Sequence, residues 1–135
     1  MENCLFCGIV EGKIPAQVIY KDSATLAFLD INPRAPGHTV VISKVHAPIL
    51  ADLPESEVGS LFGTVKKLSA HLLSKLKADG LTIGINQGGV SGQTIEHLHV
   101  HLLPRFTGDG GSSIHSVVNN PPSENLGDIA TKLTI

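Results

Sequence analysis

Apolar and polar positions along the chain predict a mixed α+β domain. Short β-branched or aromatic runs predict five strands, at residues 17–21, 25–29, 38–42, 81–86 and 97–103. Between the third and fourth runs, apolar residues recur every three or four positions and predict one long helix from Pro54 to Lys77. A short apolar segment at 5–10 predicts a helical turn, and 123–133 predicts a terminal helix capped by Ser123 or Asn125. Strands joined by short turns around one helix indicate an antiparallel sheet.

Composition narrows the class of protein without identifying it. The chain has 135 residues, 41% of them hydrophobic and 16% charged, which suits one globular domain rather than a disordered chain. A net charge of −2, 4% aromatic residues and no Trp argue against a nucleic-acid partner. The sequence has no apolar run of membrane-spanning length and begins with no basic, apolar leader, so we expect a cytoplasmic protein without a membrane partner.

The most informative stretch alternates histidines with aliphatic residues. His97, His99 and His101 are separated by Leu98 and Val100, and alternate residues of a strand point to opposite faces. Three imidazoles on one face are unusual for a merely solvated surface, which is the alternative interpretation. The first and last lie about 13 Å apart along a strand, too far to share one metal ion. We therefore expect the three rings to divide the tasks of metal ligand, nucleophile and hydrogen-bond donor.

Two further motifs carry candidate chemistry. In a reducing compartment, Cys4-x-x-Cys7 indicates a metal or redox site, but a thioredoxin-like motif would follow a strand, and Cys4 lies too near the chain start. The loop from Gly88 to Gly92 suits phosphate binding because glycines let backbone N–H groups approach oxygen closely. Alone, such a loop is weak evidence.

Taken together, these motifs resemble the histidine triad (HIT) family of nucleotide hydrolases and transferases, in its zinc-containing, prokaryote-like branch. The resemblance rests on the triad strand 97–103, with supporting matches at 6–9, 13–15, 27–30, 36–39, Asn86 and 92–93. It implies a single HIT-like domain over residues 1–135, with 1–110 well matched and 111–135 forming a C-terminal tail that has no clear counterpart in the family pattern. It also implies a five-stranded sheet continued across a homodimer through the long helix and the strand at 81–86.

The resemblance assigns roles residue by residue. It implies that His99 attacks the α-phosphorus of a purine nucleotide, that His101 and His38 contact the phosphate, and that Thr94 assists the leaving group. Gln93 would hydrogen-bond the phosphate or the bridging oxygen. Gly92 and Asn86 would lie near the phosphate, although Asn86 could simply cap its loop. Asp30 would bind the ribose hydroxyls. The slot for the base would comprise Phe6, Ile9, Phe28 and Ile31, which could equally be core residues.

The same resemblance implies a structural zinc ion and no organic cofactor. Its ligands would be Cys4, Cys7, His46 and His97, a closed set without an open position for water. The alternative is two free thiols.

The function implied is hydrolysis at the α-phosphate of adenosine phosphoramidates, aminoacyl-adenylates or dinucleoside polyphosphates through a nucleotidyl-histidine intermediate. Two alternatives stay open, namely a metal-dependent hydrolase with a catalytic zinc on His97 and His99, and a non-catalytic nucleotide-binding module. The sequence does not choose the leaving group, because each substrate presents the same α-phosphate to His99.

Overall fold

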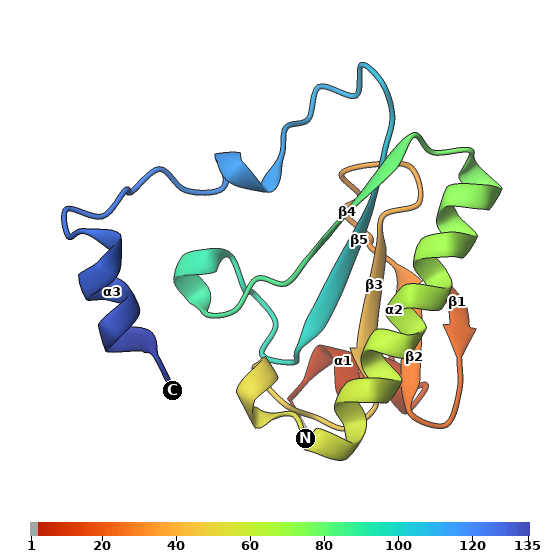
Figure 1. The fold of residues 1–135 in the computed structure, drawn as a ribbon. Helices are drawn as coiled ribbons and strands as arrows, with labels where there is room; N and C mark the ends of the chain where they lie inside the picture. Colours follow the sequence, from red (N-terminus) through yellow and green to blue (C-terminus); the bar gives the residue numbers. More distant parts are fainter. Residues whose placement is uncertain (1–2) are drawn as a thin grey trace.

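A five-stranded antiparallel sheet forms the centre of the computed structural model, which describes residues 3–135. Its strands are β1 (Val18–Lys21), β2 (Thr25–Leu29), β3 (Thr39–Ser43), β4 (Gly80–Gly84) and β5 (His99–Arg105), in the order β1-β2-β3-β5-β4 (Figure 1). β5 therefore lies between β3 and β4, and β4 is an edge strand. The predicted antiparallel α+β fold is confirmed.

The long helix α2 (Glu55–Leu76) covers one face of this sheet (Figure 1). Its apolar stripe, including Leu61, Val65 and Leu68, packs in a core cluster with Val100 and Leu102 of β5. Glu55 and Glu57 in the first turn and Lys75 in the last match the helix dipole. The helix ends where Lys77 adopts a left-handed conformation, and Gly80 starts β4.

The opposite face carries the N-terminal segment. Helix α1 (Leu5–Val10) places Phe6 in a second buried cluster with Phe28 of β2 and Val40 and Ile42 of β3. The two faces of β5 are thereby separated, with Val100 and Leu102 directed to the α2 side and the histidine positions to the α1 side.

The histidine strand differs from its predicted bounds. β5 begins at His99 rather than His97 and runs through Pro104, which had been expected to end it. The Asp79 N–H donates to the Arg105 carbonyl on the β4 side, so the backbone of Pro104 faces the other side. There the pairing with β3 has already stopped, because Thr39, the first residue of β3, lies opposite Leu102. The missing N–H of proline therefore interrupts no ladder bond.

Three short 3-10 helices were not predicted, at Leu50–Asp52, Gly89–Ser91 and Ile114–Ser116. The predicted terminal helix is present as α3 (Leu126–Leu133), capped by the Asn125 side chain. Residues 106–135 run away from the domain and end in α3, which stands apart from the sheet (Figure 1). In the part of the chain described, no helix combines the length and apolarity that crossing a membrane requires.

Candidate functional site

Histidine rings gather on the α1 face of the sheet. The His99 ring centroid lies 4.9 Å from that of His101, which lies 5.1 Å from that of His38 at the start of β3. Phe6 meets His99 edge-on at 5.1 Å, and His99 is only 6% exposed. The expected convergence of these three histidines is present, and each ring is held by packing.

One hydrogen bond determines which ring nitrogen of neutral His99 carries the proton. Its Nδ1 lies 2.7 Å from the backbone carbonyl oxygen of His97. A carbonyl oxygen only accepts, so Nδ1 donates, and in the neutral ring the lone pair is on Nε2. His99 can therefore act as a nucleophile through Nε2 without a further base.

Two linked hydrogen bonds determine which ring nitrogen carries the proton in His38 and in His101. The backbone N–H of Arg34 donates to Nδ1 of His38 at 3.1 Å, so the neutral ring carries its proton on Nε2. That Nε2–H lies 2.8 Å from Nδ1 of His101 and donates to it. His101 in turn keeps its proton on Nε2, where it is available to a bound oxyanion.

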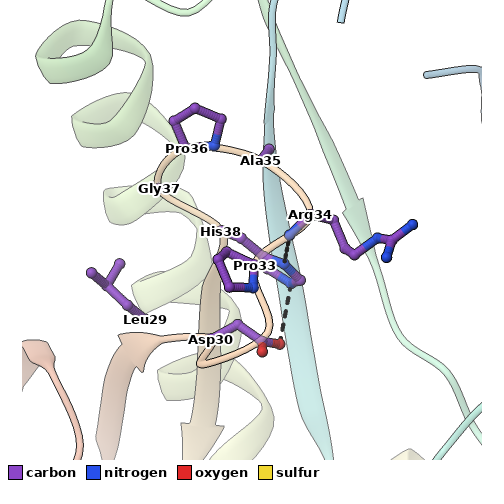
Figure 2. A pocket seen from close by; sticks show the side chains of 8 residues that line it. All are labelled: Leu29, Asp30, Pro33, Arg34, Ala35, Pro36, Gly37 and His38. Carbon is purple, nitrogen blue, oxygen red and sulfur yellow. Dashed lines mark hydrogen bonds and ion pairs between the residues drawn. The ribbon is translucent and has the colours of Figure 1, made fainter. Parts of the chain in front are cut away.

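Asp30 lies beside this chain. Its Oδ2 is 3.5 Å from Nε2 of His38 and 4.0 Å from Nδ1 of His101. Figure 2 shows Asp30, Arg34 and His38 around a cavity of about 450 Å³ formed by the turn between β2 and β3. One oxygen of Asp30 accepts from the Asn32 N–H at 2.8 Å, which positions the carboxylate.

Burial keeps the imidazoles of His38 and His101 neutral. It lowers the pKa of His38, with Asp30 opposing the shift. It also lowers the pKa of His101 to about 4, helped by the neighbouring rings of His99 and His38 and opposed by Asp30. At neutral pH both rings are uncharged hydrogen-bonding groups rather than fixed cations.

A separate cluster brings four donor atoms within 4.8 Å of one another. Its members are Cys4, Cys7, His46 and His97. Nδ1 of His97 is 3.5 Å from Sγ of Cys4 and 3.6 Å from Sγ of Cys7, and Cys7 Sγ is 3.3 Å from Nδ1 of His46. Nε2 of His97 donates to the Ser43 carbonyl at 2.8 Å, so the lone pair is on Nδ1, facing the thiols. Two sulfurs and two imidazole nitrogens at these spacings fit the edges of a tetrahedral zinc site.

Asp30, His38 and His101 also bring three donor atoms within 4.8 Å of one another. Their lone pairs are already used, because His38 accepts from Arg34 and donates to His101. An ion bound at Nε2 of His38 would force a proton onto Nδ1, against the Arg34 N–H. This group is therefore satisfied as a hydrogen-bond chain without a metal ion.

The loop before β5 holds the other predicted phosphate residues. The Gln93 side chain accepts from the Gly88 N–H at 2.8 Å and donates to the carbonyls of Pro48 and Ile95. It therefore braces the loop instead of extending into solvent. Thr94 is exposed beside a cavity of about 550 Å³ that also touches Cys4 and His46, and Asn86 lies against Gly92.

The four residues predicted for the base slot differ in exposure. Phe6 and Phe28 are buried against each other, with ring centroids 5.3 Å apart. Ile9 packs at the margin of this cluster, and Ile31 is 86% exposed. The structure places Phe6 and Phe28 in the core and leaves Ile31 in solvent.

Sequence reasoning did not identify which backbone groups orient the rings. The Arg34 N–H and the carbonyls of Ser43 and His97 select the tautomers described above. No side-chain motif signals them, because they depend on the turn at 30–38 and on the path of the chain into β5.

Comparisons with known proteins identify related chains. The model of the HIT domain matches residues 11–108. An uncharacterized HIT-like protein of Methanocaldococcus jannaschii is 47% identical over 107 residues, which are 79% of this chain and 82% of that protein. The adenylylsulfatase HINT3 of Arabidopsis thaliana is 35% identical over 76% of this chain and 52% of its own length.

Solved structures agree with these matches. A Streptococcus mutans crystal structure matches 98% of this chain and 82% of its own, at 38% identity and a TM-score of 0.84. A zinc-bound histidine triad family protein from Mycobacterium smegmatis matches 82% of this chain and 81% of its own, at 40% identity and a TM-score of 0.77.

Proposed function

The chain belongs to the HIT family, and from that premise we propose that it is a nucleotide hydrolase that cleaves at the α-phosphate through a nucleotidyl-His99 intermediate. The proposed substrates are adenosine phosphoramidates, aminoacyl-adenylates or dinucleoside polyphosphates. One observation carries the proposal: His99 Nδ1 donates to the His97 carbonyl, which leaves the lone pair of Nε2 free to attack phosphorus.

The reaction proceeds in two displacements. Nε2 of His99 forms a bond to the α-phosphorus while the bond from phosphorus to the leaving group breaks, and the leaving group takes up a proton from solvent. Water then attacks phosphorus and gives up a proton to solvent, the P–N bond breaks, and nucleoside monophosphate leaves with His99 neutral again. Nε2–H of His101 stabilises the negative charge on the phosphate oxygens in both steps.

The remaining site residues bind and orient the substrate. Asp30 accepts from the ribose hydroxyls, and His38 holds His101 in the tautomer that donates to phosphate. Gln93 maintains the loop that brings Gly92, Asn86 and Thr94 near the phosphate, where the Thr94 hydroxyl assists the leaving group. The base of the nucleotide is bordered by Phe6, Ile9, Phe28 and Ile31.

We further propose that Cys4, Cys7, His46 and His97 hold a structural zinc ion. Bound zinc would crosslink the N-terminal segment to the start of β5. Four protein ligands leave no open position for water or substrate, which favours a structural ion over a catalytic one. No organic cofactor is required by this chemistry.

We propose that the protein is cytoplasmic and forms a homodimer. Its two copies would pair through the free edge of β4 and through α2. Exposed apolar side chains on these elements, Ile83, Phe62 and Leu73, support that contact. Light scattering at micromolar concentration should give twice the chain mass, and a monomer would contradict the dimer.

The decisive experiment combines turnover with trapping of the intermediate. Adenosine 5′-phosphoramidate should be hydrolysed, and rapid acid-free quenching followed by peptide mass spectrometry should find adenylate on His99. His99→Ala should abolish turnover while retaining AMP binding, whereas His71→Ala, at an exposed histidine of α2, should leave both unchanged. Turnover by His99→Ala, or adenylate on another residue, would refute the mechanism.

The preferred leaving group can be identified by comparing kcat/KM among substrates. These are adenosine 5′-phosphoramidate, diadenosine tri- and tetraphosphate, and an aminoacyl-adenylate. Inactivity on all of them, together with retained AMP binding, would support the non-catalytic alternative.

A further inference from the structure

Arg34 is joined to the histidines of the site through its backbone, while its side chain stays uncommitted. Its N–H donates to Nδ1 of His38 at 3.1 Å, and Nε2–H of His38 donates to His101 at 2.8 Å. One imidazole ring therefore separates the Arg34 backbone from His101, the proposed donor to phosphate. Within residues 3–135, the exposed Arg34 guanidinium makes no hydrogen bond and no ion pair. It is thus free to bind a ligand beside the site.

The second arginine of the chain shows what a structural guanidinium does in this fold. Arg105 donates to both carboxylate oxygens of Asp109, at 2.8 and 3.1 Å. It also donates to the Thr82 hydroxyl at 3.0 Å and to the Ser112 carbonyl at 2.7 Å. These bonds hold the end of β5 against β4. Arg34 makes no comparable bonds in the described chain, so holding the fold together does not account for its guanidinium.

The turn between β2 and β3 nevertheless holds the backbone of Arg34 in place. The Asp30 N–H donates to the His38 carbonyl at 3.0 Å, and the His38 N–H donates to the Ala35 carbonyl at 3.1 Å. Pro33 comes directly before Arg34, and its ring fixes its own φ angle. Because the backbone is already ordered, a ligand that binds the guanidinium has only the side chain to immobilise.

The residues assigned to the phosphate include no permanent positive charge. Burial lowers the pKa of His38 and lowers that of His101 to about 4, so both rings are neutral at pH 7. At His38, Asp30 opposes this lowering and the charge of Arg34 adds to it, which indicates that the guanidinium lies near the site. Of the two cavities described above, the first is lined by Arg34, and the second is lined by no Lys or Arg among residues 3–135. A substrate with several phosphates therefore meets its cation at Arg34.

Arg34 and Asp30 lie at opposite ends of the bonded group. In Figure 2, dashed lines join Arg34 to His38 and His38 to Asp30, and the Arg34 side chain extends away from the Asp30 carboxylate. Asp30 is the proposed partner of the ribose, and His101 that of the α-phosphate. Because the α-phosphorus joins the ribose to the leaving group, the end at Arg34 is the end that receives the leaving group.

We propose that the Arg34 side chain binds anionic oxygens of the leaving group and thereby selects substrates whose leaving group carries phosphate. Among the substrates proposed above, these are the dinucleoside polyphosphates. A guanidinium presents paired N–H donors that match two phosphate oxygens. The ammonia released from a phosphoramidate offers no such oxygens, and the ammonium group of an aminoacyl-adenylate is repelled by a second cation. This inference rests on the proposed function and names the substrate class that the site prefers.

The test compares two substrates in variants of Arg34. Arg34→Gln removes the guanidinium and keeps the backbone N–H that orients His38. The ratio of kcat/KM for diadenosine tetraphosphate to kcat/KM for adenosine 5′-phosphoramidate should fall at least about tenfold in this variant. Arg34→Lys keeps the charge without the paired donors and should give an intermediate ratio. An unchanged ratio in Arg34→Gln would overturn the inference.

Lys21→Gln is the matched control, because it removes one positive charge at a distance from the site. Lys21 is exposed at the end of β1, which β2 and β3 separate from β5. The strand pairing places it at the end of the sheet remote from the turn that holds Arg34. Its substrate ratio should stay within about twofold of that of the parent chain. A fall as large as in Arg34→Gln would mean that net charge selects the substrate, which would overturn the inference.

Binding measurements separate this inference from the proposed chemistry. In His99→Ala, where no turnover is expected, calorimetry gives Kd for diadenosine tetraphosphate and for AMP. The tetraphosphate should bind more tightly, and adding Arg34→Gln should reduce that advantage at least about tenfold. The same loss of advantage in a protein whose parent chain hydrolyses neither substrate would refute the proposed chemistry and support the role of Arg34. An equal advantage with and without the guanidinium would refute the role of Arg34 alone.

Discussion

The proton on His101 is controlled by two groups outside the triad, the Arg34 N–H and the His38 ring. His38→Ala removes the donor to Nδ1 of His101, so the ring can place its proton on either nitrogen. We expect kcat for phosphoramidate hydrolysis to fall at least about tenfold, with little change in melting temperature. Steady-state kinetics and calorimetry check this. Unchanged kcat would show that His38 does not position His101.

Neutral buried imidazoles make stability depend on pH. The unfolded chain protonates its histidines below about pH 6.5, whereas burial holds the pKa of folded His101 at about 4 and lowers that of His38. The unfolded state therefore binds more protons in this window, and stability falls as pH drops. His101 alone should cost about 2 kcal/mol between pH 7 and pH 5.

Urea denaturation of the parent chain and of His101→Gln at both pH values measures this contribution. The variant should lose less of its free energy of unfolding between pH 7 and pH 5. An identical loss in both proteins would mean that His101 is not the titrating group.

At the scale of elements, the turn between β2 and β3 depends on Gly37. Its φ is +81°, and an added Cβ would lie 2.4 Å from Cδ1 of Leu76 in α2. Gly37→Ala should lower the free energy of unfolding by about 2–3 kcal/mol and also displace His38, reducing turnover. Gly12→Ala, at φ +74° in open space, is the matched control and should cost only about 1 kcal/mol. Equal losses in chemical denaturation would contradict the close contact with α2.

Patterns in the sequence predicted the elements better than the details of the site. β-branched runs and the stripe from Val58 to Leu76 predicted the strands and α2, because burial of one face determines both. The path of β5 through Pro104 was not predictable, since it depends on where β3 begins. The bracing role of Gln93 was equally hidden, because its partners are backbone groups distant in sequence.

For the whole molecule, the cysteine cluster should contribute to stability rather than to chemistry. Cys4→Ser should remove bound zinc, as measured by elemental analysis, and lower the free energy of unfolding by about 2–4 kcal/mol. The folded fraction should still hydrolyse substrate, because the proposed ion lies outside the reacting atoms. His97→Ala should show both defects, because the His97 ring is a proposed zinc ligand and also packs on Phe6, which contacts the ring of His99.

Two results would change that interpretation. Full stability and full zinc content in Cys4→Ser would identify ordinary thiols. Loss of turnover in a folded, zinc-free variant would identify a catalytic ion.

Phe6 joins parts of the molecule that are distant along the chain. Its ring meets Phe28 of β2, His97 and His99 within about 6 Å. Chain ends usually fray, with amides that exchange with solvent long before the core opens. Here the α1 segment cannot open without uncovering the nucleophile. Amide hydrogens of α1 should therefore exchange at the slow rate of β5, so that the beginning of the chain and its active site open as one cooperative unit.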